Sequence, residues 1–382
     1  MHNKKILLIF GTRPEAIKLA PLYKILKSKD SSFELITCTT GQHKEMLQQV
    51  MEIFDISSDI DLDLMRANQD LSDLTANILT SIRDVIRKVK PDLVIVHGDT
   101  TTAFGSSLAS FYESIPVAHV EAGLRTNNLY EPFPEEFNRQ IATKISHLHF
   151  APTELSKMNL ISENISKDKI FVTGNTVIDS LFLALNNLEQ DKNKSDLIYN
   201  EINKLLGFDS QKKDYILITG HRRENFGDGF LNICHAIKEL AQKFQHFNFI
   251  YPVHLNPNVQ KPVKSILRNI SNVKLIEPLQ YLHFLLLLKN CYLILTDSGG
   301  IQEEAPSLGK PVLVMRNTTE RPEGVRSNTL KLIGTKKENI IKNVSELIEK
   351  KDVYNEMSNS INPYGDGTAS KKILDILEDF FK

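Results

Sequence analysis

Side chains that can transfer protons stand at the ends of short apolar runs in this sequence. Asp99 and Glu121 each follow such a run closely, and Glu135 and Glu136 come a few residues later. A carboxyl group at the end of a buried strand loses part of its hydration, which raises its pKa toward the range useful in acid and base catalysis. These carboxylates are therefore candidate acids and bases.

The local sequence leaves structural alternatives open for the same residues. Asp99 could be the N-cap of a helix that begins near Thr102. Glu135 and Glu136 could be solvated residues at a helix start after Pro134, and spacing alone favours that alternative.

The strongest single motif is DSGGIQEE, residues 297–304, between an apolar run and a helical stretch. Gly299 and Gly300 let a ligand approach the backbone, Ser298 offers a hydroxyl, and free amides at a helix start favour phosphate. The alternative is a tight turn with Ser298 as the N-cap. Phosphate binding is preferred because we expect this turn at the ligand-binding edge of a sheet.

Cationic side chains add to this chemistry. Arg13 and Lys18 could hold an anion, although an arginine before a proline at a helix start is also an ordinary surface arrangement. His221, beside Arg222, is a candidate for neutralising phosphate charge or transferring a proton. His147 and His149 have no third ligand nearby in the sequence, so we expect no metal site.

Nucleotide-binding signatures of other enzyme classes are missing. No Gly-x-Gly-x-x-Gly follows the first apolar run, and Gly309-Lys310 lacks the earlier glycine of a P-loop. A nicotinamide-dependent dehydrogenase and a P-loop kinase are both disfavoured, and we expect no cofactor.

Two series of short β-branched runs must position these residues, and they predict buried parallel strands. The runs are 6–10, 33–38, 93–96, 117–120, 148–150 and 170–172, followed by 215–218, 247–251, 273–276, 292–295, 312–315 and 330–333. Helical periodicity between them, as at 16–28, 71–90 and 230–244, indicates strand–helix–strand crossovers. The predicted fold class is α/β, with two Rossmann-like doubly wound domains.

The predicted domain boundary follows Asn175, where an apolar helix over 177–188 leads into a polar stretch, 189–195, expected to be a solvated connection. A turn at 362–367 and an amphipathic helix at the end of the chain are expected to cover the first domain. The predicted domains are 1–175, completed by 363–382, and 176–362.

Composition excludes several classes of protein. The chain has 382 residues, and 46 Lys and Arg against 47 Asp and Glu give a net charge of −1, which argues against nucleic acid and membrane partners. Three scattered cysteines fit reduced thiols in a cytoplasmic protein. The apolar runs are too short for a signal peptide or a membrane span.

Taken together, these motifs resemble the non-hydrolysing UDP-N-acetylglucosamine 2-epimerases of bacteria. The matching segments are 11–18, 97–102, 119–125, 134–139, 174–179, 220–224, 251–258 and 297–315, so the resemblance spans nearly the whole chain. It implies a glycosyltransferase-B-like fold, in which two Rossmann-like domains face a central cleft.

The resemblance implies interconversion of UDP-N-acetylglucosamine and UDP-N-acetylmannosamine without NAD. UDP is lost by anti elimination, and the glycal intermediate takes it back with the opposite configuration at C2. The product would supply cell-surface polysaccharide synthesis. The implied partners are the two nucleotide sugars and UDP, and the implied assembly is a homodimer.

The family's residue roles carry over to matching positions. The implied catalytic set is Asp99, Glu121, Glu135 and His221. The implied substrate-binding set is Arg13, Phe284, Ser298, Gly299, Glu304 and Arg321, to which the motifs themselves add Lys18 and Gly300. Some members bind a second UDP-N-acetylglucosamine as an activator, and the matching residues are Gln42, Gln69, Glu136, Arg222 and His254. Asn68 stands where some members have Arg.

Three competing functions share parts of this pattern. A glycosyltransferase of the same fold would need an acceptor and not three carboxylates around the sugar. A hydrolysing 2-epimerase is disfavoured by the uninterrupted match at 11–15. A catalytically dead regulator is disfavoured by the retained carboxylates and His221.

Overall fold

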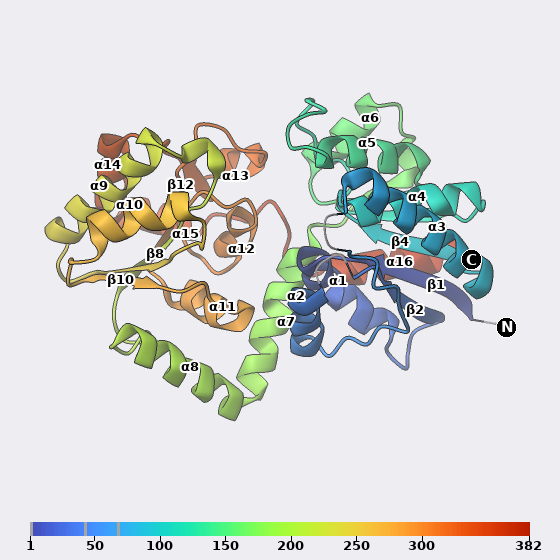
Figure 1. The fold of residues 1–382 in the computed structure, drawn as a ribbon, viewed down its shortest axis with the longest axis horizontal. Coiled ribbons are helices and arrows are strands. Elements are labelled where there is room, and N and C mark those ends of the chain that lie inside the picture. Colours follow the sequence, from blue (N-terminus) through green and yellow to red (C-terminus); the bar gives the residue numbers. More distant parts are fainter. Residues whose placement is uncertain (1–2, 42–43, 67–68) are drawn as a thin grey trace. The chain divides into compact units, whose positions relative to one another are not determined.

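The computed structural model describes residues 3–41, 44–66 and 69–382. Its contacts divide the chain into two compact units (Figure 1). Unit 1 comprises Met1–Ala184 with Tyr364–Lys382, and unit 2 comprises Leu185–Pro363. The chain passes from unit 1 to unit 2 within one long helix, α7, Thr176–Gln190.

Unit 1 contains a seven-stranded parallel sheet in the order β3-β2-β1-β4-β5-β6-β7. Its strands are β1 Lys4–Phe10, β2 Phe33–Thr39, β3 Ile60–Asp61, β4 Leu93–His97, β5 Val117–Val120, β6 Leu148–Ala151 and β7 Ile170–Val172. The central strands β4 and β5 are buried at every position. This burial explains why they appear in the sequence as continuous apolar runs.

Helices link consecutive strands of unit 1. They are α1 Arg13–Leu26, α2 Lys44–Ile53, α3 Leu71–Val89, α4 Thr101–Tyr112, α5 Glu135–Ile145, α6 Glu154–Ser162, a 3₁₀ turn Lys167–Lys169, and the first part of α7. The last helix, α16 Ala369–Phe380, packs against α1. Asp179 of α7 accepts hydrogen bonds from the amides of Ala369 and Ser370, so a buried carboxylate caps the start of α16.

Unit 2 contains a six-stranded parallel sheet in the order β10-β9-β8-β11-β12-β13. Its strands are β8 Tyr215–Thr219, β9 Asn248–Pro252, β10 Val273–Ile276, β11 Leu293–Thr296, β12 Val312–Val314 and β13 Leu330–Leu332. Its helices are α8 Lys192–Leu206, a 3₁₀ turn Arg223–Asn225, α9 Asp228–Lys243, α10 Pro257–Leu267, α11 Tyr281–Asn290, α12 Ile301–Ser307, α13 Pro322–Arg326, α14 Lys337–Glu349 and α15 Lys351–Ser358.

All twelve predicted strands are present, and the α/β class with two Rossmann-like sheets is confirmed. The two-residue strand β3 was not predicted, because it is too short to show a pattern. The predicted solvated connection at 189–195 is wrong in conformation. α7 runs to Gln190, and Asp191 caps α8 by accepting a hydrogen bond from the Lys194 amide at 3.0 Å.

Each sheet has one point where the strand order reverses, between β1 and β4 in unit 1 and between β8 and β11 in unit 2. Loops after neighbouring strands diverge at such a point and leave a crevice that binds ligands in open α/β sheets. The segments after these strands are 11–15, 98–100, 220–225 and 297–300. Four of the motifs singled out in the sequence therefore lie at switch points.

Among residues 3–41, 44–66 and 69–382, no helix is both long and apolar enough to cross a bilayer.

Candidate active site

Glu121 is the centre of a buried charge cluster in unit 1. It follows β5 directly, with a φ of 64°. Its Oε2 atom accepts a short hydrogen bond from Lys18 Nζ of α1 and a 2.7 Å hydrogen bond from Asn175 Nδ2. The structure thus joins three segments that are far apart in the sequence.

The surroundings of Glu121 favour its ionised form. Burial alone would raise the pKa of Glu121, but the Lys18 ammonium and its hydrogen bonds lower it well below its usual range. His97 Nε2 lies 3.8 Å from Glu121 Oε2, and burial lowers the pKa of His97 to about 3, so this imidazole is neutral at pH 7. Lys18 is therefore the main counter-charge of Glu121.

Asp99 follows β4 and Gly98, across the switch point from α1. Its carboxylate makes a short ion pair with Arg139 of α5, and its side chain is 25% exposed. Burial raises the pKa of Asp99 despite Arg139, and nearby Glu121 raises it further. Two neighbouring carboxyl groups thus have pKa values shifted in opposite directions, as acid and base pairs do in active sites.

Asp99 is not the N-cap of the following helix, so that local alternative is wrong. Thr100 caps α4, and its Oγ1 accepts a 3.0 Å hydrogen bond from the Ala103 amide. Since the capping position is filled by Thr100, the Asp99 carboxylate is left for Arg139.

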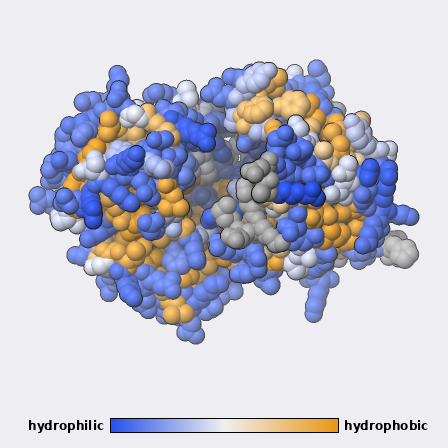
Figure 2. Space-filling view, in the orientation of Figure 1, coloured by the Kyte–Doolittle hydropathy of each residue, from blue (hydrophilic) through white to orange (hydrophobic). Residues whose placement is uncertain are grey.

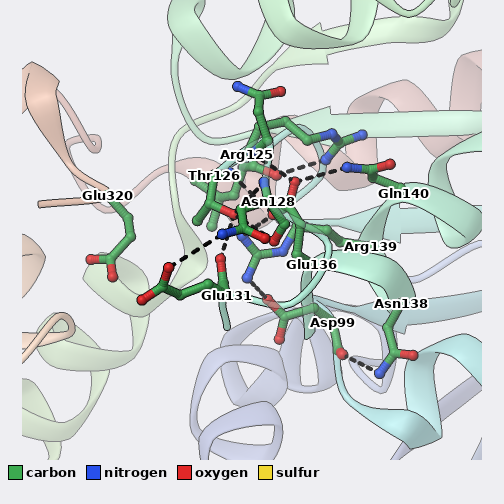
Figure 3. A network of polar contacts seen from close by, with 12 residues as sticks. Asp99, Arg125, Thr126, Asn128, Glu131, Glu136, Asn138, Arg139, Gln140 and Glu320 are labelled. Carbon is green, nitrogen blue, oxygen red and sulfur yellow. Dashed lines mark hydrogen bonds and ion pairs between the residues drawn. The ribbon is translucent and has the colours of Figure 1, made fainter. Parts of the chain in front are cut away.

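A polar network connects Asp99 with the loop that precedes α5 (Figure 3). Arg139 also donates to Glu136 Oε2 at 3.2 Å. Glu136 in addition accepts hydrogen bonds from the amides of Thr126 and Asn127 and from Gln140 Nε2, at 2.9–3.2 Å. Glu136 is 0% exposed, so the alternative of a solvated helix-start residue is wrong for it. It fixes the 126–127 turn beside the Asp99–Arg139 pair.

Glu135 is the first residue of α5 and is half-buried. Its Oε2 atom is buried and has no hydrogen-bond partner in the described part of the chain. A buried carboxylate oxygen without a donor carries a free-energy cost, which a hydrogen bond from a substrate would remove.

The other predicted residues of unit 1 make few side-chain contacts or lie outside the described residues. Arg13 is half-buried at the first position of α1, and its side chain makes no hydrogen bond or ion pair with any described residue. Gln69 accepts a 3.3 Å hydrogen bond from the Arg66 amide, and its Nε2 atom is buried without a partner in the described ranges. Gln42 and Asn68 lie outside the described residues.

In unit 2, a buried aspartate organises the segments on both sides of the switch point. Asp297 follows β11 and is 0% exposed. Its Oδ2 atom accepts hydrogen bonds at 2.9 Å from the amides of His221 and Arg222, which follow β8. Asn225 Nδ2 donates to the same oxygen at 3.2 Å. Asp297 therefore holds the backbone from which His221 and Arg222 project.

The His221 imidazole is available at this edge. Its side chain is 41% exposed, and its ring stacks on His254 with a centroid distance of 5.3 Å. Burial lowers the pKa of His221 and His254 contributes in the same direction, although Asp297 Oδ1, 3.6 Å from Nδ1, opposes them. Arg222 is half-buried beside it. The structure thus brings together His221, Arg222 and His254.

The DSGG segment packs closely against an arginine. A Cβ atom on Gly299 would lie 2.8 Å from Arg321 Nη1, so any other residue at this position would displace the guanidinium. Glu303 Oε1 accepts a 2.6 Å hydrogen bond from Arg321 Nε and fixes the side chain. Arg321 is thereby positioned beside the backbone of Gly299.

Ser298 is not the N-cap of α12, so that alternative is wrong as well. Gly300 occupies the capping position, and no side chain in the described structure caps this helix. Glu304 lies in the first turn of α12 and is half-buried. Phe284 is half-buried on α11.

Comparison with known proteins identifies the family. Residues 26–378 match the protein family described as UDP-N-acetylglucosamine 2-epimerase. The UDP-N-acetylglucosamine 2-epimerase of Campylobacter jejuni is 54% identical over 98% of this chain and 97% of its own length, and that of Escherichia coli K12 is 51% identical over 98% of both. The chain belongs to the UDP-N-acetylglucosamine 2-epimerase family.

Solved structures agree with this family assignment. The crystal structure of the Neisseria meningitidis UDP-GlcNAc 2-epimerase bound to UDP-GlcNAc is 52% identical, with a TM-score of 0.89 over 98% of this chain and all of the other. The Methanocaldococcus jannaschii UDP-GlcNAc 2-epimerase in complex with UDP-GlcNAc and UDP is 36% identical, with a TM-score of 0.79 over 98% and 99% of the two chains. The predicted glycosyltransferase-B-like fold class and the isomerase class are confirmed.

Three residues that position this 2-epimerase's charged groups were not among the predicted site residues. Arg139 and Asn175 lie inside segments that we matched to the family, but we gave them no role. Glu15 accepts hydrogen bonds from the amides of Gly11 and Thr12 and a 2.6 Å hydrogen bond from Thr100 Oγ1. It thereby ties the loop after β1 to the loop after β4. The Thr12-x-x-Glu15 spacing of a capping box was a signal for it.

No metal centre is formed by the described part of this epimerase, where no group of three or more His, Cys, Asp or Glu side chains could hold an ion.

Proposed function

We propose that this chain interconverts UDP-N-acetylglucosamine and UDP-N-acetylmannosamine by inverting the configuration at C2. The observation that carries the proposal is the pair Asp99 and Glu121, which follow the neighbouring strands β4 and β5 and have pKa values shifted in opposite directions. The C2 hydrogen is only weakly acidic, so the reaction needs a positioned base, a positioned acid and a stabilised leaving group.

In the proposed mechanism, a carboxylate of unit 1 takes the C2 proton, a C1=C2 double bond forms, and the C1–O bond breaks with its electron pair leaving on UDP. UDP then adds back to C1 while a second carboxyl group delivers a proton to the other face of C2. Glu121, held ionised by Lys18, suits the role of base, and Asp99 suits the role of acid. Glu135, whose Oε2 atom has no hydrogen-bond partner among the described residues, is proposed as the third member of this set.

Unit 2 is proposed to bind the UDP portion. Arg321, fixed beside Gly299, and His221 supply positive charge or hydrogen bonds for the diphosphate, together with Ser298 and Gly300. Glu304 is proposed to bind the ribose hydroxyls and Phe284 to lie beside the uracil. Neutralising the diphosphate makes UDP a better leaving group.

The test is to incubate the protein with UDP-N-acetylglucosamine alone in deuterium oxide and record proton NMR spectra. We expect the manno epimer to appear without NAD, metal or acceptor, with solvent deuterium at C2. Glu121→Gln serves as the control, because it keeps the side-chain size but removes the base. Retention of the C2 hydrogen would refute the elimination mechanism, and a requirement for an acceptor sugar would indicate a glycosyltransferase.

We further propose that a second UDP-N-acetylglucosamine binds as an activator, and that Gln42 and Gln69 of unit 1 and Arg222 and His254 of unit 2 are the residues involved. Gln69 Nε2 is buried and has no partner among the described residues, and the exposed His254 ring stacks on His221, which supports the proposal. Since Glu136 is fully buried, we propose that it contributes through the turn that it holds. Gln69→Ala should make the substrate dependence of the rate less sigmoidal.

We also propose that the protein is a homodimer of the cytoplasm whose product supplies surface polysaccharide synthesis. Exposed aromatic residues on α4 and α5, Phe111, Tyr112 and Phe137, support self-association, and an apolar patch is visible over the α5 region of unit 1 in Figure 2. The three buried free cysteines suit a reducing compartment. Sedimentation of Phe111→Glu should give a monomer if this surface forms the dimer.

A further inference from the structure

Asn175, between β7 and α7, is a buried residue whose side chain and backbone amide both make hydrogen bonds. It is 2% exposed. Its Nδ2 atom donates to Glu121 Oε2 at 2.7 Å, its Oδ1 atom accepts from the Val177 amide at 3.2 Å, and its own amide donates to the Tyr364 carbonyl at 2.7 Å. The side chain therefore links the Glu121 carboxylate to the start of α7.

These contacts fix which end of the Asn175 amide faces Glu121. Because Oδ1 accepts from a backbone N–H, the NH₂ group points to the carboxylate and a flipped amide would lose both hydrogen bonds. The returning chain holds the backbone in place, since a Cβ atom on Gly174 would lie only 3.3 Å from Gly365 Cα. Asn175 is thus a rigid donor aimed at one oxygen of Glu121.

The two oxygens of Glu121 have different environments as a result. Lys18 and Asn175 both donate to Oε2, and no donor within the described residues reaches Oε1. The charged and titratable groups around this carboxylate are Lys18 of α1, His97 of β4, Asp99 after β4 and His119 of β5. Oε1 is therefore the oxygen that is free to accept a proton from a substrate.

We propose that Asn175 is a positioning residue for the 2-epimerase reaction, which holds Glu121 by Oε2 so that Oε1 is presented to the sugar. This inference rests on the proposed function. It assigns Asn175 no contact with the substrate. The competing explanation is structural, namely that Asn175 only caps the start of α7 and anchors the returning chain.

Asn175→Asp separates the two explanations. Aspartate is as good an N-cap as asparagine, so it keeps the acceptor for the Val177 amide. It replaces the donor with a second carboxylate that faces Glu121. Two carboxylates at hydrogen-bond distance cannot both stay ionised easily, so this pair should bind a proton as the pH falls, and the protonated aspartate would again be a donor.

The experiment measures kcat and KM for UDP-N-acetylglucosamine between pH 6 and pH 8.5 for the wild type and Asn175→Asp. We expect kcat of the variant to be at least about tenfold lower than that of the wild type at pH 8.5, because the charge-assisted hydrogen bond to Glu121 is lost. The difference in kcat should become smaller toward pH 6, because the protonated aspartate forms this hydrogen bond again. KM, UDP affinity and thermal stability should stay close to wild type. Asn203→Asp is the matched control, because Asn203 Oδ1 likewise accepts from a backbone amide, that of Ser210 at 2.8 Å, in unit 2.

A deficit that is the same at every pH, or wild-type activity throughout, would overturn the inference. If Asn175→Asp does not fold, Asn175→Ser decides the question, because serine keeps a capping acceptor but is too short to reach Glu121. It should lower kcat with UDP binding intact, and normal turnover would overturn the inference. Failure of the proposed function is seen separately, since the wild-type protein would then form no epimer.

Discussion

Replacing His149 with leucine should make unit 1 less sensitive to acid. His149 lies in β6, is 0% exposed, and neither of its ring nitrogens has a hydrogen-bond partner among the described residues. Burial lowers the pKa of His149 to about 3, and nearby His119 and Lys169 act in the same direction. The folded protein therefore keeps this imidazole neutral in the pH range where the unfolded chain protonates it.

The sign and size of the effect follow from this difference. Because the folded-state pKa is depressed, stability from this group is present above pH 6.5 and is lost as the pH falls toward 3. Each pH unit below 6.5 costs about 1.4 kcal/mol, so lowering the pH from 7.5 to 5.0 should cost about 2 kcal/mol through His149 alone. His149→Leu should lose about 2 kcal/mol less over the same interval.

Calorimetry and denaturant unfolding at pH 7.5 and 5.0 measure this difference. All other titrating groups are shared by the two proteins, so subtracting the two pH effects isolates His149. His147→Leu is the comparison variant. His147 is exposed two residues earlier, and burial lowers its pKa as well, so its replacement should remove a smaller part of the acid sensitivity than His149→Leu does. Equal stability losses in the wild type and His149→Leu would refute the conclusion that His149 stays neutral in the folded state.

Three further substitutions test the two units. Gly299→Ala should displace Arg321 and weaken UDP binding about tenfold or more, the scale of one charge-assisted hydrogen bond, as measured by titration calorimetry. Gly229→Ala is the control, because its Cβ atom would lie 3.4 Å from Thr335, an ordinary contact, and it should leave UDP affinity unchanged. Unaltered affinity in Gly299→Ala would remove Arg321 from the UDP site. Glu15→Gln should lower the free energy of unfolding by about 1–3 kcal/mol, because the NH₂ group of glutamine would face a hydrogen-bond donor where the carboxylate oxygen now accepts. An unchanged midpoint of urea unfolding would contradict this. Glu135→Gln should reduce turnover at least roughly a hundredfold with UDP binding preserved, and near-normal turnover would make Glu135 a structural residue.

Much of the fold could be predicted because its signals are local. A strand buried on both faces, such as β4, has to be a continuous apolar run, and a helix that covers it has to repeat with its own period. Since parallel strands end at one edge of a sheet, the loops that hold Asp99, Glu121, His221 and Asp297 could be assigned to ligand-binding edges before any contact was known. The polar segment 189–195 misled us, because exposed helices and exposed connections have similar composition.

The sequence by itself determined the two sheets, the loops that follow their strands and the residue types in those loops. Only the tertiary structure decided which side chains meet. Lys18 and Asn175 both donate to one carboxylate oxygen of Glu121, although the three residues come from distant segments. Arg139 contacts both Asp99 and Glu136, a glutamate that local spacing predicts to be solvated. The physical reason is that capping and periodicity act over a few residues. Hydrogen bonds between loops depend instead on the order in which the crossovers place the strands in the sheet, and no single stretch of the chain determines that order.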